Sequence, residues 1–160
     1  RGAPCIYLRP GRSDVLGVFE ALGEKAYVRH FCCGVEDIEN SIYNASLEAG
    51  VALVGCTQII DCAGITYAKA RNTTGVYLSL TNEILKGNFP ETSRVVMIVN
   101  VPWFLSFGWS MLRPLLPKRT VEKTNIFSEG YWDTLVKFVD PSEIPPWLGG
   151  RSERPWPFSD

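Results

Sequence analysis

The feature that most constrains this chain is a long uncharged stretch, RVVMIVNVPWFLSFGWSMLRP, at residues 94–114. Residues 95–112 carry no charge, and an apolar run of about 18 residues is long enough to be a transmembrane helix. Two residues in the middle argue against a span. Asn100 is polar, and Pro102 lacks a backbone donor and disfavours a helical conformation in the residue before it. The run therefore predicts a strand, a turn and a helix.

The strand is expected over residues 95–99, where β-branched residues dominate, and the helix over 102–112. The helix has apolar groups on every side, among them Trp103, Phe104, Phe107 and Met111. Such a helix is either buried in a large core or in contact with a membrane. The segment after it is basic, with Arg113, Lys118, Arg119 and Lys123 against the single acid Glu122. This pattern fits an anionic lipid surface, where each cation contributes about 1 kcal/mol. It fits equally well a core helix followed by a charged turn in solvent.

Composition describes one ordinary globular domain. The chain has 160 residues, of which 46% are apolar and 21% charged, so it is long enough to bury a substantial core. The net charge of −1 gives no general attraction to nucleic acid. Five cysteines, none in a CxxC pair, and the lack of a visible signal peptide favour a reduced intracellular compartment. Because the first residue is arginine rather than methionine, we expect an excised fragment of a longer protein.

The order of the predicted elements favours an α/β fold. Strands are expected at residues 5–8, 51–60, 95–99 and 124–127, and helices at 24–48, 70–84, 102–112 and around Leu135. Alternation of this kind indicates a mostly parallel sheet covered by helices. The last residues are rich in proline and glycine and are expected to be irregular.

The motifs of common enzymes are missing. Residues 50–55 have the spacing of a phosphate-binding loop, but Cys56-Thr57 follows where lysine and a hydroxyl residue are needed. No G-x-S-x-G motif occurs. His30 is the single histidine, which excludes a multi-histidine metal site in this segment. A set of one cysteine, His30 and Asp61 remains open, with nothing in the pattern to favour it. We expect a protein that is not an enzyme and has no cofactor.

The order NFPE, VVMIVNVPWFLSFGWSMLRPLLPKRTVEKTN and IPPWLGG resembles the CRAL-TRIO lipid-binding family, which includes phosphatidylinositol transfer proteins. The matching features are Pro90-Glu91, Asn100-Val-Pro102, Arg113-Pro-Leu-Leu116, Thr120-x-x-Lys123 and Gly149-Gly150. Upstream, CTQIIDCAGIT and APCIYLRPGRSDVLGVF look like the family's strands and turns. The resemblance implies a lipid-binding lobe over residues 1–150, an irregular tail over 151–160, and a missing upstream helical domain.

The resemblance also implies a deep apolar pocket for one lipid, closed by a gate helix that moves at the membrane. The gate would be the helix carrying Trp103, Phe104, Phe107 and Met111. An enclosed pocket is required because each lipid CH₂ left in water costs about 0.8 kcal/mol. A gate role would explain why the helix is apolar on both sides, because one side would face the pocket and the other the bilayer.

In members that bind phosphatidylinositol, a Glu, a Thr and a Lys contact the headgroup, and Glu91, Thr120 and Lys123 stand at those places. Lys123 would meet the phosphate as a point charge. Members that also bind phosphatidylcholine carry a tyrosine and a pair of hydroxyl residues at a second site. This chain has Ile6, Cys56 and Gln58 there. Ile6 and Cys56 replace a hydroxyl's hydrogen bonds poorly, so the identity of the second ligand is open.

The sequence therefore predicts a cytoplasmic protein, peripheral at membranes, that binds phosphatidylinositol or a phosphoinositide and transfers it. Its partners would be the lipid and the membrane surface, with no nucleic acid. The alternative from another class is a regulatory protein-interaction module of a larger protein that keeps the fold without exchanging lipid. A lipid-processing enzyme is disfavoured by the missing nucleophile motif.

Overall fold

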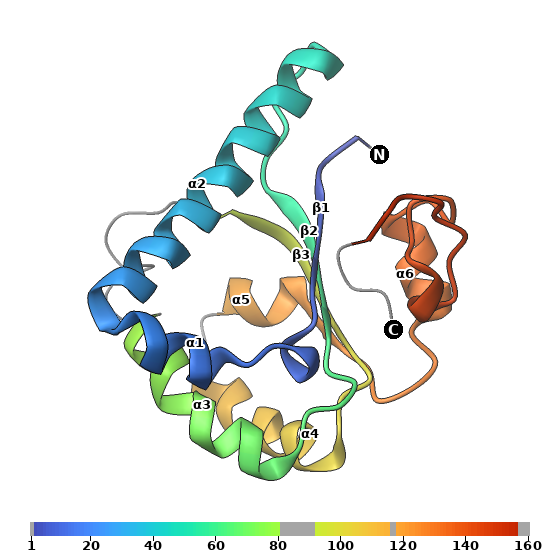
Figure 1. Cartoon of the computed structure of the whole chain (residues 1–160). Helices are drawn as coiled ribbons and strands as arrows, with labels where there is room; N and C mark the ends of the chain where they lie inside the picture. Colours follow the sequence, from blue (N-terminus) through green and yellow to red (C-terminus); the bar gives the residue numbers. More distant parts are fainter. Residues whose placement is uncertain (1, 81–91, 116–117, 157–160) are drawn as a thin grey trace.

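A four-stranded parallel sheet forms the centre of the molecule in the computed structural model, which describes residues 2–80, 92–115 and 118–156. The strands are β1 (Cys5–Leu8), β2 (Cys56–Asp61), β3 (Ser93–Val99) and β4 (Thr124–Ile126), and they lie in the order β1-β2-β3-β4. Every neighbouring pair is parallel. Helical segments connect these strands (Figure 1). The prediction of an α/β fold with a mostly parallel sheet covered by helices is confirmed.

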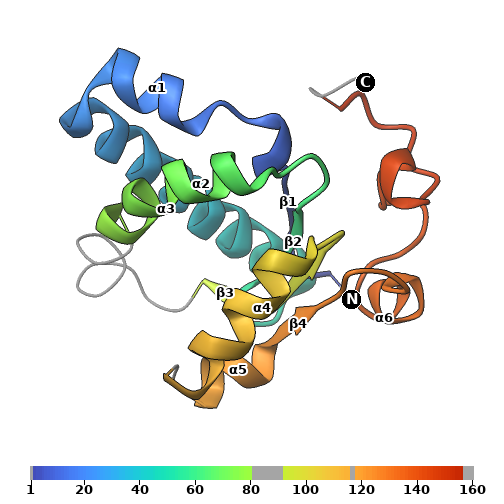
Figure 2. The same ribbon diagram turned by 90° about the horizontal axis from the view of Figure 1, so that it is seen from below.

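Helices lie on both sides of the sheet. The α-helices are α1 (Val15–Leu22), α2 (Glu24–Ala49), α3 (Tyr67–Leu80), α4 (Trp103–Leu112), α5 (Lys118–Lys123) and α6 (Trp132–Phe138). Short 3₁₀ turns are η1 (Pro10–Arg12), η3 (Arg113–Leu115) and η4 (Pro146–Leu148). Seen from below, α1, α2 and α3 group on one side of the strands and α6 lies on the other (Figure 2).

Local chemistry explains where the long helix ends. Helix α2 follows Gly23 and stops at Gly50, whose φ of 65° is the left-handed conformation that glycine adopts most readily. Helix α1 begins at Asp14, whose carboxylate accepts a hydrogen bond from the Gly17 amide at 3.1 Å. The sequence prediction of a helix over residues 24–48 was accurate to one residue at its end. Helix α1 was not predicted.

The second strand starts later than predicted. Residues 51–55 precede β2 rather than belonging to it. Gly55 has a φ of +72°, and a Cβ placed there would lie 2.8 Å from the Arg94 amide nitrogen, so the chain turns tightly at this point. The Leu53 amide also donates to Ser46 Oγ at 3.0 Å. These contacts use backbone that a strand would need for pairing, which explains the shift of the boundary to Cys56.

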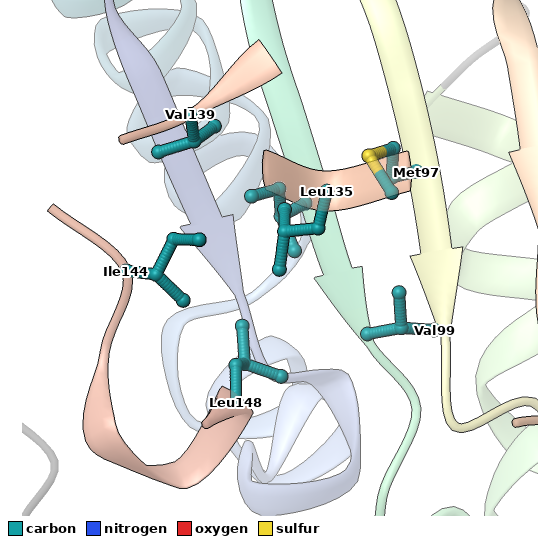
Figure 3. Packing of buried hydrophobic residues seen from close by; sticks show 7 residues of the cluster. Met97, Val99, Leu135, Val139, Ile144 and Leu148 are labelled. Atoms are coloured by element: carbon teal, nitrogen blue, oxygen red, sulfur yellow. The ribbon is translucent and has the colours of Figure 1, made fainter. Parts of the chain in front are cut away.

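The main hydrophobic core lies between one face of the sheet and the C-terminal part of the chain. Its buried members are Ile59, Met97, Val99, Leu135, Val139, Ile144 and Leu148. Figure 3 shows Leu135 of α6 facing the strands, with Ile144 and Leu148 from the segment that follows. Full burial of one such side chain contributes about 1.5–3 kcal/mol. A second, smaller cluster joins α1, α2 and α3 around Tyr27 and Val76.

The uncharged run at residues 95–112 divides between β3 and α4, as predicted. Between them, Asn100 adopts a φ of 54°, and asparagine is one of the few residues that tolerate this conformation. Within the ranges that the structure describes, no helix is both long and apolar enough to cross a membrane.

Candidate functional site

A cavity of about 910 Å³ lies between the other face of the sheet and helices α1, α2 and α3. Pockets that hold small ligands span about 300–1,000 Å³ and are mostly apolar. The sheet contributes Ile6, Leu8, Gln58 and Ile60, and the helices contribute Val15, Val18, Tyr27, Phe31, Val35 and Ile38. Most of the wall is therefore apolar.

Helix α4 reaches the cavity with one side and solvent with the other. Leu105 is part of the cavity wall. Trp103, Phe107 and Met111 are 80%, 65% and 64% exposed. Phe104 is half-buried, and its ring meets the ring of Tyr67 edge-on at a centroid distance of 5.6 Å. Helix α4 is therefore neither fully buried in the core nor an ordinary polar surface helix. It exposes large apolar side chains to water beside the cavity.

A buried polar network holds the turn before α4. Asn100 Nδ2 donates to Asp61 Oδ1 at 2.8 Å, and the Ala63 amide donates to the same oxygen at 3.0 Å. Asp61 Oδ2 lies 3.5 Å from Arg9 Nε, with both side chains buried. The Arg9 guanidinium in turn stacks over Trp147 at 4.5 Å from the ring centroid. The turn into α4 is therefore tied to the ends of β1 and β2 and to the C-terminal segment.

The basic segment after α4 includes a short helix rather than a turn alone. In α5, Lys118 Nζ lies 3.6 Å from Glu122 Oε1 on the surface. At the end of α5, Lys123 Nζ donates to the Ser93 carbonyl oxygen at 3.3 Å. Ser93 is part of the cavity wall. Lys123 thus brings a positive charge next to the cavity at the start of β3, and we call this place the cavity rim.

The other residues proposed for the headgroup are placed less directly. Thr120 lies in α5, one turn before Lys123, and its carbonyl oxygen accepts from Thr124 Oγ1 at 2.7 Å. Thr120 does not belong to the cavity wall described above. Glu91 lies outside the described residues. The structure brings Lys123 to the cavity rim, and the contact of all three with one headgroup stays a prediction.

The altered second site splits into two parts. Ile6 and Gln58 are register partners on β1 and β2, and both line the cavity. Cys56 is completely buried and is not a wall residue. The register between β2 and β3 shifts at Cys56 and Thr57, which interrupts the regular alternation of side chains. Because Ile6 and Gln58 line the cavity, the side chains at these two positions can contact a ligand directly.

Sequence reasoning missed Lys69. This residue lies in α3, lines the cavity, and donates from Nζ to the Gly11 carbonyl oxygen at 2.8 Å. The available signal was the spacing: Ile65, just before α3, and Lys69 and Thr73 within it follow at intervals of four, and all three line the cavity. A lysine on an otherwise inward-facing stripe indicates either a buried contact or a ligand.

The described residues show little nucleophilic or metal-binding chemistry. Burial raises the pKa of the Cys5 and Cys62 thiols to about 11, which keeps both protonated at neutral pH. All five cysteines are free of disulfides. Within residues 2–80, 92–115 and 118–156, no group of three histidine, cysteine or acidic side chains could hold a metal ion.

Comparison with known proteins decides the family. A profile described as the CRAL/TRIO domain matches residues 1–150. The chain belongs to the CRAL-TRIO family. The resemblance seen in its motifs is confirmed, and it extends over the sheet, the cavity wall and helices α1 to α6.

Relatives of this CRAL-TRIO chain are longer proteins. Phosphatidylinositol/phosphatidylcholine transfer protein SFH9 of Arabidopsis thaliana is 25% identical over 151 residues, covering 94% of this chain and 26% of SFH9. Patellin-6 of the same plant is 34% identical over 96 residues, covering 59% of this chain and 22% of Patellin-6. The crystal structure of Sfh5 aligns with 65% of this chain and 39% of its own, at 15% identity and a TM-score of 0.43. The chain spans about a quarter of the length of the two Arabidopsis relatives.

Proposed function

We propose that this CRAL-TRIO domain binds one phospholipid, phosphatidylinositol or a phosphoinositide, and exchanges it at membranes. The observation that carries the proposal is the mostly apolar cavity of about 910 Å³ with the Lys123 ammonium at its rim. Relatives named phosphatidylinositol/phosphatidylcholine transfer proteins support lipid binding and transfer as the general activity. In this proposal the domain is a carrier without a catalytic step.

The acyl chains would occupy the cavity. Burial of apolar surface contributes about 25 cal/mol per Å², and the side chains of α1 and α2 offer such surface opposite Ile6 and Ile60. The headgroup would lie at the rim, where Lys123 meets the phosphate and Thr120 and Glu91 meet inositol hydroxyls. A cation next to an apolar cavity favours an anionic headgroup, because the ammonium attracts a phosphate as a point charge.

The choline lipid is disfavoured in this proposal. At the place of the second site, the cavity wall presents the alkyl chain of Ile6 and the amide of Gln58. Neither supplies a hydroxyl. We expect phosphatidylcholine to bind more weakly than phosphatidylinositol, or a more apolar lipid to take its place.

Helix α4 would be the gate. Its exposed Trp103, Phe107 and Met111 would enter the lipid interface while Leu105 faces the bound lipid. Arg113, Lys118 and Arg119, all exposed to solvent, follow α4 and would attract an anionic membrane surface. In this proposal the working protein is cytoplasmic and peripheral at membranes.

Competition between labelled phosphatidylinositol and phosphatidylcholine tests the headgroup assignment. Soluble short-chain forms of both lipids should be used, so that membrane docking does not contribute. We expect wild type to prefer phosphatidylinositol and Lys123→Ala to lose about tenfold in its affinity, which corresponds to about 1.4 kcal/mol. Lys118→Ala is the matched control, because Lys118 lies on the same helix and its side chain is 89% exposed. Equal binding of the two lipids, or an unchanged Lys123→Ala variant, would show that the headgroup site is elsewhere.

A further inference from the structure

We propose a second anion-binding site in the cavity, at Lys69 of α3, that takes the carboxylate of a long-chain fatty acid. The proposal rests on the proposed function in one respect: the same apolar cavity holds the hydrocarbon chain. The Lys69 site adds a polar contact at the end of the cavity opposite Lys123. It also adds a second class of ligand, a fatty acid.

The Lys69 ammonium lies in the cavity wall with hydrogen-bonding capacity to spare. It can donate three hydrogen bonds, and the structure gives it one acceptor, the Gly11 carbonyl oxygen at 2.8 Å. Among the residues that the structure describes, no carboxylate forms an ion pair with Lys69. A half-buried cation that faces an apolar space with one neutral partner is unfavourable unless water or an anion completes its shell.

The Gly11 contact fixes the position of this charge. Gly11 lies so close to the backbone after β2 that a Cβ on it would lie 1.9 Å from the Ala63 carbonyl oxygen. Side-chain adjustment cannot relieve such backbone contact, so only glycine fits. The Gly11 carbonyl is thus held in place, and it anchors Lys69 at the edge of the sheet where β1 and β2 end.

Lys69 and Lys123 lie at opposite edges of the sheet. Lys123 contacts Ser93, the first residue of β3, whereas Lys69 contacts Gly11, in the turn that follows the last residue of β1. The strands are parallel, and the seven residues of β3 span roughly 20 Å at about 3.3 Å per residue. One headgroup cannot reach both cations. Lys69 therefore has to recognise a different polar group.

The surroundings of Lys69 favour a singly charged group. The neighbouring hydroxyls are already donors: Thr73 Oγ1 donates to the Lys69 carbonyl at 2.9 Å, and Ser13 Oγ donates to the Arg9 carbonyl at 3.1 Å. Arg9 is paired with Asp61. Asp14, another wall residue, adds a negative charge. Two spare N–H groups in a wall that also carries an acid suit the two oxygens of a carboxylate, and they suit a doubly charged phosphate monoester poorly.

A fluorescent fatty acid and its ester separate this site from general apolar binding. cis-Parinaric acid and its methyl ester share one hydrocarbon chain and differ at the head, which is a charged carboxylate in the acid and a neutral methyl ester in the other. Each is titrated into the whole 160-residue chain, and binding is followed by the fluorescence of the polyene. We expect the acid to bind about tenfold more tightly than the ester to wild type, and Lys69→Met to remove that preference. Lys69→Arg should retain it, and Lys25→Met, an exposed lysine of α2, is the control.

The ester also separates a ligand contact from a structural one. If Lys69 only anchored Gly11, its removal would weaken the acid and the ester equally. Acetate and inorganic phosphate test free anions as an alternative source of the charge, and neither should displace the bound acid. Equal binding of acid and ester to wild type, a preference that persists in Lys69→Met, or tighter binding of lysophosphatidic acid than of the fatty acid would each overturn the proposal.

The test of the Lys69 site can be separated from the test of the phosphatidylinositol site. Lys123→Ala should leave the preference for the acid unchanged, and Lys69→Met should leave the preference for phosphatidylinositol over phosphatidylcholine unchanged. A chain that distinguishes acid from ester but does not bind phosphatidylinositol would overturn the proposed function and support the site at Lys69. A chain that binds phosphatidylinositol and treats acid and ester alike would do the reverse.

Discussion

At the scale of single residues, polar side chains inside the fold have two roles. They stabilise the turn before α4, and they bring charge to the two ends of the cavity. Asn100 serves the turn in two ways, through its φ of 54° and through its hydrogen bond to Asp61. Lys123 and Lys69 serve the ends of the cavity, and each donates to a backbone carbonyl oxygen that it meets from another element. The sequence motifs pointed to Asn100 and Lys123. Lys69 belongs to none of these motifs; its spacing with Ile65 and Thr73 was the available signal, and its partner Gly11 lies 58 residues away in the chain.

Two substitutions of Asn100 should destabilise the domain by different amounts, which separates the hydrogen bond from the backbone conformation. Asn100→Ala loses the hydrogen bond to buried Asp61 and puts alanine, which tolerates the left-handed region less well than asparagine, at this φ, so we expect a loss of about 2–4 kcal/mol. Asn100→Gly loses only the hydrogen bond and should cost less, about 1–3 kcal/mol. Urea denaturation measures both, and Asn44→Ala on the exposed side of α2 is the control. Equal losses in the two Asn100 variants would contradict a role for the positive φ.

The buried thiols should make the domain sensitive to alkali. Folding raises the pKa of Cys5 and Cys62 from about 9 to about 11. Below pH 9 these thiols are protonated in both states, and above it the unfolded chain ionises first. The free energy of unfolding should therefore fall as the pH rises from about 9 to about 11. Denaturation in urea across this range measures it, and Cys62→Ala should show a smaller fall than Cys33→Ala, because Cys33 is exposed. Parallel pH curves for both variants would contradict the assignment.

At the scale of elements, prediction from sequence succeeded where a segment had a strong period and clear ends. The long helix between Gly23 and Gly50 and the strand before Asn100 are examples. It failed for α1, VLGVFEAL, which is short and carries a glycine in its first turn. It also failed for α5, KRTVEK, where the charges suggested a turn in solvent. Both missed helices lack a long apolar stripe, and contacts with the rest of the fold stabilise short helices more than local propensity does.

The exposed side of α4 should be needed for transfer between membranes. Phe107→Asp places a charge on a side chain that is 65% exposed, so the fold should persist while binding to liposomes and vesicle-to-vesicle transfer of phosphatidylinositol fall. Phe104→Asp should impair transfer as well, but its ring packs against Tyr67, so some stability is lost with it. Circular dichroism monitors the fold.

Tyr43→Asp is the matched control for the gate. Tyr43 is 63% exposed and lies in α2, away from α4. If a negative charge at any exposed apolar position slowed transfer, the control would slow it too. Unchanged transfer in a folded Phe107→Asp variant would exclude α4 as the membrane-facing gate.

At the scale of the whole molecule, the sheet separates two different interiors. On one side, Leu135, Ile144 and their neighbours fill the space against the strands as a solid core (Figure 3). On the other side, α1, α2 and α3 lie over a cavity of about 910 Å³. The family resemblance implied an apolar pocket with Lys123 at its headgroup site, whereas the cation Lys69 became evident from its folded position against Gly11. The central claim is that this cavity holds a lipid in the working protein.

Mass spectrometry of the lipid that co-purifies with the chain tests that claim most directly. The protein is isolated without detergent from cells that contain phosphatidylinositol, and its lipids are extracted. The extract is compared with one from Ile60→Trp, in which a larger side chain on the wall occupies part of the cavity. We expect one defined lipid class, phosphatidylinositol or a phosphoinositide, at close to one molecule per chain in wild type and strongly reduced in the folded variant. An empty cavity in wild type, or a mixture that mirrors the membrane composition and is unchanged in Ile60→Trp, would contradict it and favour a regulatory interaction module.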